Sequence, residues 1–275
     1  MVKKIAVIND LSGFGKCSLS VALPIISSMG MECVALPTAI LSNQTGFDSF
    51  YSVDFTNHLT PFIDEWKKQN AEFDAILTGY LGSEKQVDII IDFIDHFGKN
   101  ALVFVDPVMA DDGVVYDTYN DVLCEKVKAL AKKANIITPN LTELCILCGA
   151  DYNEISKEEN YHKIEALAQS LLSDTTKTVI VTGVKTNDKI FNIIVDENST
   201  NVVKSTLLKG SYSGTGDIFS SVVCGGVVNG KSVTDAVTLA TEFIAKSIKS
   251  TPTKLDYEPD GVNFQKQLEM LINAE

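Results

Sequence analysis

Short apolar runs alternate with amphipathic stretches along most of the chain. The runs are rich in Val and Ile, and several are apolar at every position, which is typical of strands buried inside a parallel sheet. We predict strands at Ile5–Asn9, Cys33–Ala39, Ala75–Tyr80, Leu102–Val108, Ile136–Pro139 and Val179–Gly183.

Between these runs, apolar residues recur at three- and four-residue spacing, which predicts helices at Glu84–Phe97, Asp121–Lys132 and Tyr161–Leu172. Alternation of strand and helix predicts an α/β fold. The sheet should be doubly wound and mostly parallel, with helices on both of its faces.

The rhythm changes after Gly183. Lys189–Asp196 and Val202–Leu208 are predicted to form an antiparallel pair of strands. Three helices should follow, at Gly216–Val228, Val233–Lys249 and Val262–Ile272. The most loop-like stretches, Asp106–Gly113 and Thr251–Gly261, are too short to separate domains, so residues 1–275 are expected to form one domain.

The excess of acidic over basic residues limits the kinds of molecule that this protein could bind. A formal net charge of −13 argues against nucleic acid and disfavours an anionic membrane surface. No apolar run approaches the roughly 20 residues that span a bilayer. The N-terminal segment reads as a strand and not as a signal peptide.

Six cysteines are scattered along the chain, and Cys145 and Cys148 form a CxxC pair inside an apolar run. With no second pair, buried and reduced thiols are favoured over a metal or redox site. The expected location is the cytoplasm.

Polar residues follow each predicted strand, at the edge where open parallel sheets bind their ligands. They are Asn9-Asp10, Thr38, Thr78-Gly79-Tyr80, Asp106, Thr138-Pro139-Asn140 and Thr182-Gly183. We therefore expect an acidic, hydroxyl-rich site at this edge.

Two glycine clusters could bind phosphate. Gly13-Phe14-Gly15-Lys16 fits neither the Walker pattern nor GxGxxG, because Asp10, Cys17 and Ser18 occupy required positions. Gly214-Thr215-Gly216 directly precedes an apolar helix, where converging N–H groups and the helix dipole would form an anion hole. Asp217 beside it could accept a proton from an attacking hydroxyl. In the alternative, the glycines form a turn and Asp217 only complements the dipole.

Asn140 and Glu143 have the spacing of a helix capping box. Glu143 could also serve Mg²⁺ together with Asp106, since Mg²⁺ takes few carboxylates and keeps several waters. The two roles are compatible.

These residues resemble a known family. Asn140–Glu143 followed by Gly214–Asp217 resembles the paired motifs of the ribokinase-like superfamily. Further segments resemble pyridoxal kinases within it, at Leu41–Gly46, Leu77–Ser83, Asp106–Met109 and Thr138–Asn140.

The resemblance implies ATP-dependent phosphorylation of the 5′-hydroxyl of pyridoxal, pyridoxine or pyridoxamine. It implies Mg²⁺, in many members a monovalent cation such as K⁺, and a homodimer. It makes Asp217 the base and Gly214, Thr215 and Gly216 the anion hole. Thr45, Gly46 and Tyr80 would face the vitamer. Residues near the nucleotide and the metal would be Asp106, Thr138, Asn140, Glu143, Thr182 and Lys204, although a strand lysine such as Lys204 is more often simply exposed.

One position departs from the family pattern, which has a ring-contacting Ser in a Gln-Ser pair after the first strand. This chain has Asn9-Asp10. Asp10 could bind the protonated ring nitrogen or the ammonium of pyridoxamine, and would then favour that vitamer. Alternatively, it forms an Asx turn or caps a helix within Gly15–Met29.

Two other functions stay open. Hydroxymethylpyrimidine kinases share most of these motifs, but usually carry Cys where Asp217 stands. A vitamin-binding relative without turnover is the non-enzymatic alternative, which the intact Gly214–Asp217 motif disfavours.

Overall fold

The computed structural model describes residues 2–157, 162–252 and 257–272, and its centre is a nine-stranded sheet. The strands of this sheet are β1 (Lys4–Ser12), β2 (Glu32–Leu41), β3 (Ser52–Asp54), β4 (Ala75–Thr78), β5 (Leu102–Val105), β8 (Ile136–Ile137), β9 (Thr178–Lys185), β10 (Lys189–Asp196) and β11 (Thr200–Thr206). Their order is β11-β10-β9-β8-β5-β4-β1-β2-β3. Strands β2, β1, β4, β5, β8 and β9 are parallel, while β3, β10 and β11 join through antiparallel pairings. The prediction of a mostly parallel α/β sheet is confirmed.

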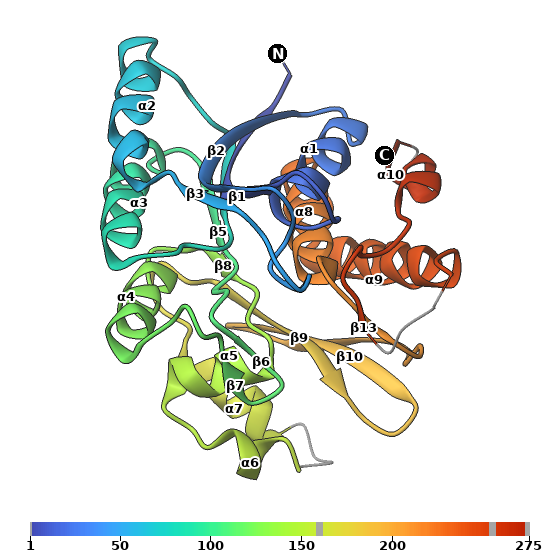
Figure 1. The fold of residues 1–275 in the computed structure, drawn as a ribbon. Coiled ribbons are helices and arrows are strands. Elements are labelled where there is room, and N and C mark those ends of the chain that lie inside the picture. Colours follow the sequence, from blue (N-terminus) through green and yellow to red (C-terminus); the bar gives the residue numbers. More distant parts are fainter. Residues whose placement is uncertain (1, 158–161, 253–256, 273–275) are drawn as a thin grey trace.

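Helices cover both faces of the sheet (Figure 1). They are α1 (Ser18–Ser28), α2 (Thr56–Lys68), α3 (Glu84–Phe97), α4 (Asp121–Ala131), α5 (Leu141–Cys148), α6 (Tyr152–Ile155), α7 (His162–Ser170), α8 (Thr215–Val228), α9 (Val233–Lys249) and α10 (Glu269–Ile272). Two small sheets pair β6 (Ala110–Asp111) with β7 (Val114–Val115) and β12 (Ser211–Tyr212) with β13 (Tyr257–Glu258).

Successive side chains of β1 point to opposite faces of the sheet and so belong to two separate hydrophobic clusters. Ala6 and Ile8 pack with α2, α3, α4, α5 and α7, whereas Ile5 and Val7 pack with α1, α8 and α9. All four side chains are fully buried. This explains why the run is apolar at every position, because both faces of a central parallel strand are covered.

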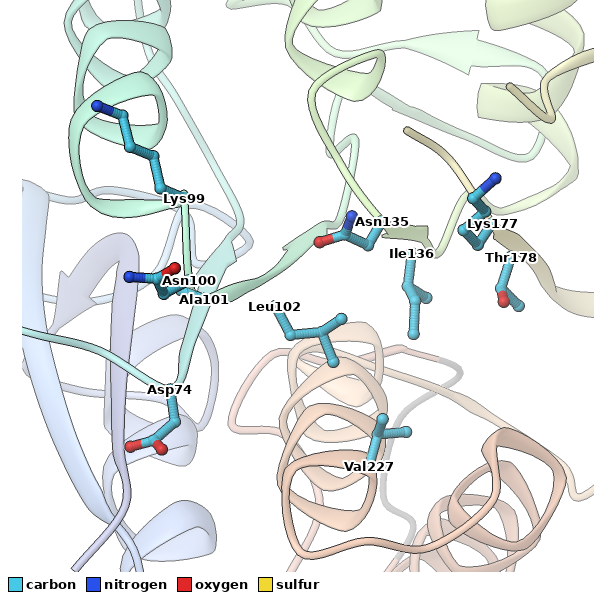
Figure 2. Close-up of a pocket in the computed structure, with 10 residues that line it drawn as sticks. All are labelled: Asp74, Lys99, Asn100, Ala101, Leu102, Asn135, Ile136, Lys177, Thr178 and Val227. Atoms are coloured by element: carbon cyan, nitrogen blue, oxygen red, sulfur yellow. The ribbon is translucent and has the colours of Figure 1, made fainter. Parts of the chain in front are cut away.

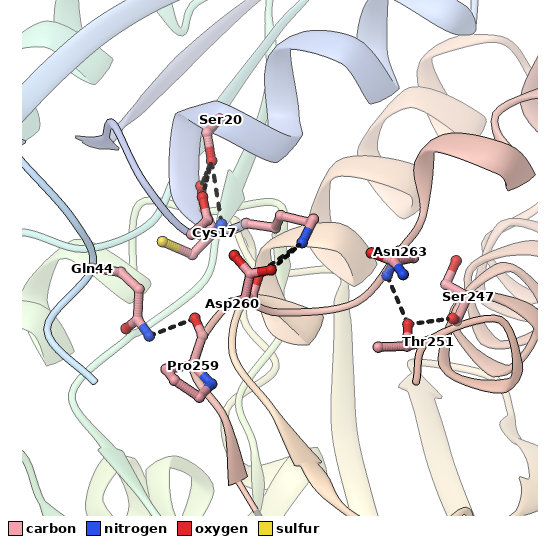
Figure 3. A network of polar contacts seen from close by, with 10 residues as sticks. Cys17, Ser20, Gln44, Ser247, Thr251, Pro259, Asp260 and Asn263 are labelled. Carbon is pink, nitrogen blue, oxygen red and sulfur yellow. Dashed lines mark hydrogen bonds and ion pairs between the residues drawn. The ribbon is translucent and has the colours of Figure 1, made fainter. Parts of the chain in front are cut away.

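The bounds of several predicted elements were wrong. The proposed helix Val262–Ile272 is interrupted: it has a 3₁₀ turn at Gln265–Gln267 and α10 is only four residues long. Val262 and Phe264 are buried on the core side instead, while the N–H of Asn263 donates to the Thr251 hydroxyl (2.7 Å; Figure 3). Several strands also end earlier than predicted, because their last residues leave the ladder at the sheet edge.

Helix α2, with Pro61 inside it, was not predicted. The first residue of the predicted helix Tyr161–Leu172 lies outside the described residues, as do residues 253–256 of the loop-like stretch Thr251–Gly261. All six cysteines are free thiols, and burial raises the pKa of Cys145 to about 11. No helix in the described ranges is long and apolar enough to cross a membrane.

Candidate active site

The candidate site lies at the carboxyl ends of the central strands, where the order in which strands are added to the sheet changes direction. From β1 the chain adds β2 on one side and then β4 on the other, so the β1–β4 gap is the switch point at which open α/β sheets bind ligands. Asn9 lies beside Gly79 there, since the Gly79 N–H donates to the Ile8 carbonyl (2.8 Å).

A pocket of about 520 Å³ lies at the other end of the strands, where their amino ends are (Figure 2). Asp74, Lys99 and Asn135 are among the residues that line it, at the amino ends of the strands. None of the predicted site residues lies in its lining.

The glycine-rich segment forms the entrance to α8, as predicted. Gly214 has φ +76°, and a Cβ there would overlap the backbone carbonyl of Lys16. A side chain at Gly214 would therefore force the two loops apart. A Cβ at Gly216 would meet nothing within 4 Å, so there is open space beside the first turn of this 14-residue helix. This geometry suits an anion.

Asp217 stands in the first turn of α8 and is half-buried. Burial raises the pKa of its carboxyl group to about 6, and the charge of Asp10 adds to the shift, whereas hydrogen bonds from the Ser18 N–H and the Asn9 amide lower it. The group is thus a carboxylate at neutral pH and a stronger base than a solvated Asp.

Asn9, which was predicted to lie at this edge but was given no role, supports Asp217. Its side chain is 5% exposed, and its Nδ2 donates to Oδ1 of Asp217 (2.9 Å). Its Oδ1 accepts the N–H groups of Asp10 (3.0 Å) and Tyr80 (2.9 Å). A polar residue at the end of an otherwise apolar buried run was the available sequence signal.

Asp10 is buried and has two partners inside the protein. Its carboxylate accepts the hydroxyls of Ser18 (2.5 Å) and Ser12 (3.2 Å). Burial raises the pKa of Asp10, and these two bonds lower it. Ser18 begins α1 with φ +51°, so Asp10 holds a residue in the left-handed region. This observation favours the structural interpretation of Asp10, although contact with a vitamer stays a prediction.

Glu143 and Asn140 form the predicted capping box at the start of α5. The carboxylate of Glu143 accepts the N–H groups of Asn140 (2.9 Å) and Met109 (3.2 Å). Burial, followed by repulsion from Asp106, raises the pKa of Glu143. Glu143 therefore lies close enough to Asp106 for their charges to interact.

Asp106 follows β5, and its charge interacts with those of both Asp217 and Glu143. Burial and then repulsion from Asp217 raise the pKa of Asp106, against the lowering effect of the Ser220 and Thr138 hydroxyls. The buried Oγ1 of Thr138 has no hydrogen bond of acceptable geometry within the described residues. A cation beside Asp106 would offset this crowding of negative charge.

This donor set fits Mg²⁺ but not a cage made only of protein ligands. Within the described ranges, no group of three His, Cys, Asp or Glu side chains could hold a metal. Mg²⁺ is commonly bound through one or two carboxylates together with substrate phosphates and water. Asp106 fits as the direct ligand, and Glu143 as its charged neighbour.

The remaining nucleotide-side residues differ in their placement. The Thr182 N–H donates to the Pro139 carbonyl (2.9 Å), which joins β9 to the segment that carries Asn140. Asn140 in turn donates to the carbonyl of Ala110 (2.7 Å). Lys204 lies exposed on the edge strand β11. This agrees with the alternative that Lys204 is an ordinary exposed lysine of a strand.

On the other side of the site, Thr45 and Gly46 are exposed and Tyr80 is half-buried. The Gly46 N–H donates to Oε1 of Gln44 (2.8 Å), and Nε2 of Gln44 donates to the carbonyl of Pro259 (2.7 Å; Figure 3). The loop that carries Thr45 is thus tied to the C-terminal segment.

A second tie joins the same C-terminal segment to the loop before α1. Lys16 forms an ion pair with Asp260 (3.2 Å) and donates to its carbonyl (3.0 Å). Because the Lys16 carbonyl also packs against Gly214, the loops before α1 and α8 are held together beside Asp217.

The chain is similar to known proteins in sequence and in fold. A family model described as phosphomethylpyrimidine kinase matches residues 23–260. A solved structure of a candidate phosphomethylpyrimidine kinase of Bacteroides thetaiotaomicron, in a crystal form with pyridoxal, is 37% identical. The match covers 98% of this chain and 96% of that one, with a TM-score of 0.91.

Pyridoxal kinases are also similar over most of their length. The structure of the Lactobacillus plantarum pyridoxal kinase is 27% identical, with coverage of 99% and 97% and a TM-score of 0.90. The pyridoxal kinase PdxY of Actinobacillus succinogenes is 29% identical over 245 residues, 83% of this chain and 82% of the relative. The chain therefore belongs to the phosphomethylpyrimidine kinase family, within the ribokinase-like superfamily that its motifs predicted.

Proposed function

We propose that this protein is a pyridoxal kinase, which transfers the γ-phosphoryl group of ATP to the 5′-hydroxyl of a vitamin B6 vitamer. The observation that carries the proposal is Asp217, a half-buried carboxylate with a raised pKa, fixed beside the open N-terminus of α8. The pyridoxal kinases among the relatives support the choice of substrate.

In this reaction the 5′-oxygen attacks the γ-phosphorus while Asp217 takes the hydroxyl proton. ADP leaves as the bond from the γ-phosphorus to the bridging oxygen breaks. The N–H groups of Thr215, Gly216 and Asp217 stabilise the charge on the transferring oxygens. Gly214 gives the loop the close approach that this arrangement requires.

The other site residues bind and orient the reactants. Thr45, Gly46 and Tyr80 would line the vitamer side. Thr138, Asn140 and Thr182 would approach the nucleotide, with Lys204 at the margin. Mg²⁺, held by Asp106 beside Glu143, would neutralise phosphate charge when bound. A monovalent cation such as K⁺, a homodimer, a single domain and a cytoplasmic location complete the proposal.

The substrate is tested with a panel of alcohols. Initial rates of ADP release with Mg²⁺ and ATP are measured for pyridoxal, pyridoxine, pyridoxamine and hydroxymethylpyrimidine, and each product is identified by mass. We expect the highest kcat/KM with a B6 vitamer. Turnover confined to hydroxymethylpyrimidine would reject the proposal.

Hydroxymethylpyrimidine kinase is the second candidate, because the matching family model is described as phosphomethylpyrimidine kinase. Asp217 in place of the usual Cys favours the B6 reaction. A vitamin-binding protein without turnover would bind pyridoxal and ATP and form no product, an outcome that the same panel detects.

A further inference from the structure

The carboxyl-terminal half of β1 carries the side-chain amide of Asn9, and the hydrogen bonds to its oxygen fix the orientation of this amide. Two backbone N–H groups, of Asp10 and Tyr80, donate to Oδ1 of Asn9. An amide oxygen has two lone pairs, so both are used. The amide nitrogen must then face the other way, toward Oδ1 of Asp217 at 2.9 Å.

The protein also makes room for this amide. Gly79 follows β4 directly opposite Asn9, and a Cβ at that position would overlap the Asn9 side chain. Gly79 has no positive φ that would require glycine. The absence of a side chain at Gly79 is thus explained by the amide, which sits 5% exposed in the switch point.

We infer that Asn9 is a positioning residue, which holds the carboxylate of Asp217 in the orientation that accepts the substrate proton. The inference rests on the proposed role of Asp217 as the base. Asn9 donates to Oδ1, and the N–H of Ser18, the first residue of α1, donates to the same carboxylate. Two donors from different segments fix a planar carboxylate more tightly than one, and misplacement by about 1 Å can cost about 100-fold in rate.

Asn9→Asp separates positioning from a merely structural role. Asp keeps the size of the side chain and an oxygen that accepts the N–H groups of Asp10 and Tyr80. It removes the N–H donor and places a second carboxylate against Asp217. The added charge would raise the pKa of Asp217, so kcat is compared on the plateau that it reaches at high pH. There a structural role alone would leave kcat almost unchanged, whereas positioning predicts a fall in kcat of about 10- to 100-fold, with the KM for ATP changed by less than about twofold.

Asn135→Asp is the matched control. Asn135 also accepts a backbone N–H through its side-chain oxygen, from Val103 (2.8 Å), but it lies at the opposite edge of the sheet (Figure 2). We expect this variant to keep the kcat of the wild type. Melting curves of both variants show whether the two substitutions cost similar stability.

A double-mutant cycle with Asp217→Asn tests the coupling, on whichever alcohol the wild type phosphorylates best. Once the base is gone its orientation no longer matters, so adding Asn9→Asp should change kcat by less than about twofold. A full 10- to 100-fold effect in that background would overturn the role of Asn9 while leaving the proposed kinase intact.

Gly79→Ala is a second variant, which leaves Asn9 itself in place. Its Cβ would displace the amide and should lower kcat in the wild type but not in Asp217→Asn. Unchanged kcat in both Asn9→Asp and Gly79→Ala would also overturn the inference. A wild type that phosphorylates no alcohol of the panel would reject the proposed function, and with it the role of Asn9.

Discussion

The role proposed for Asp217 as the base depends on where its carboxylate lies. Desolvation in the first turn of α8 raises its pKa, while two hydrogen-bond donors keep the raised value at about 6. A base is most effective when its pKa lies close to the working pH and yet leaves it ionised. Asp217 meets this condition, and the hydrogen bonds from Ser18 and Asn9 oppose the rise in its pKa that burial causes.

The pH dependence of the reaction follows from this pKa. We expect kcat/KM to rise tenfold per pH unit below about pH 6 and to level off above it, because only the ionised form of Asp217 accepts the proton. Initial rates between about pH 5 and 8 with Mg²⁺ and ATP in excess test this. A profile that stays flat through pH 6 would contradict the assignment.

Asp10 is the residue for which two outcomes are open. Its bonds to Ser12 and Ser18 support a structural role, whereas vitamer contact predicts a preference for pyridoxamine. Given these bonds, we expect Asp10→Ser to lower kcat/KM for pyridoxal and pyridoxamine by the same factor. A change of the ratio by more than about fivefold would instead show that Asp10 selects the vitamer.

At the scale of elements, hydrophobic periodicity predicted the helices and strands whose buried residues recur with a helical or strand period along the chain. The structure has Glu84–Phe97, Lys189–Asp196 and Val233–Lys249 with the predicted bounds. The pattern failed in the C-terminal segment, where Val262 and Phe264 are buried because distant helices cover them. Such tertiary burial leaves no helical or strand period to detect.

Some residues of the candidate site could be predicted from the sequence, and others could not. Asp217, Asp106 and Glu143 follow from strand ends and helix starts, which the chain order reveals. The role of Asn9 depends on which strand lies next to β1, and that neighbour, β4, comes about 70 residues later in the chain. Sequence alone did not show the hydrogen bonds that Asn9 makes across this gap.

Helix α5 gives a prediction at this scale. In Glu143→Gln, one of the two accepted N–H groups loses its carboxylate oxygen, so the free energy of unfolding should fall by about 1 kcal/mol. The loss of charge beside Asp106 should also raise the Mg²⁺ concentration for half-maximal rate by several-fold. Melting curves and Mg²⁺ titrations measure the two effects.

Asp235→Asn provides the control, since Asp235 pairs with the N-cap Ser232 of α9. Helix α8 has 14 residues and is about 21 Å long, so the chain has left the site when α9 begins. This variant should alter stability alone. A normal Mg²⁺ titration in Glu143→Gln would assign Glu143 to capping only.

At the scale of the whole molecule, folding brings together several carboxyl groups whose ionisation is less favourable in the folded protein than in the unfolded one. Burial raises the pKa of Asp10, Asp106, Glu143 and Asp217 alike. Each group binds its proton more tightly in the folded than in the unfolded protein. Stability must therefore fall as pH rises through the interval between the two pKa values.

Asp217→Asn should for this reason stabilise the protein. The interval for Asp217 runs from 3.8 to about 6, so the gain is absent below about pH 4 and complete above about pH 6. We expect about 1–2 kcal/mol in the free energy of unfolding at pH 8, since the half-buried group retains part of its hydration. Urea unfolding at pH 4 and pH 8 tests the sign; a variant less stable than the wild type at pH 8 would contradict it.

The most direct test of the account is pyridoxal 5′-phosphate formation by the wild type and Asp217→Asn, with ATP binding measured by calorimetry. The account predicts one product per ADP in the wild type and a kcat about 100- to 10,000-fold lower in the variant, with ATP affinity nearly unchanged. A wild type that forms no pyridoxal 5′-phosphate, or a variant that keeps more than about a tenth of the wild-type kcat, would contradict it.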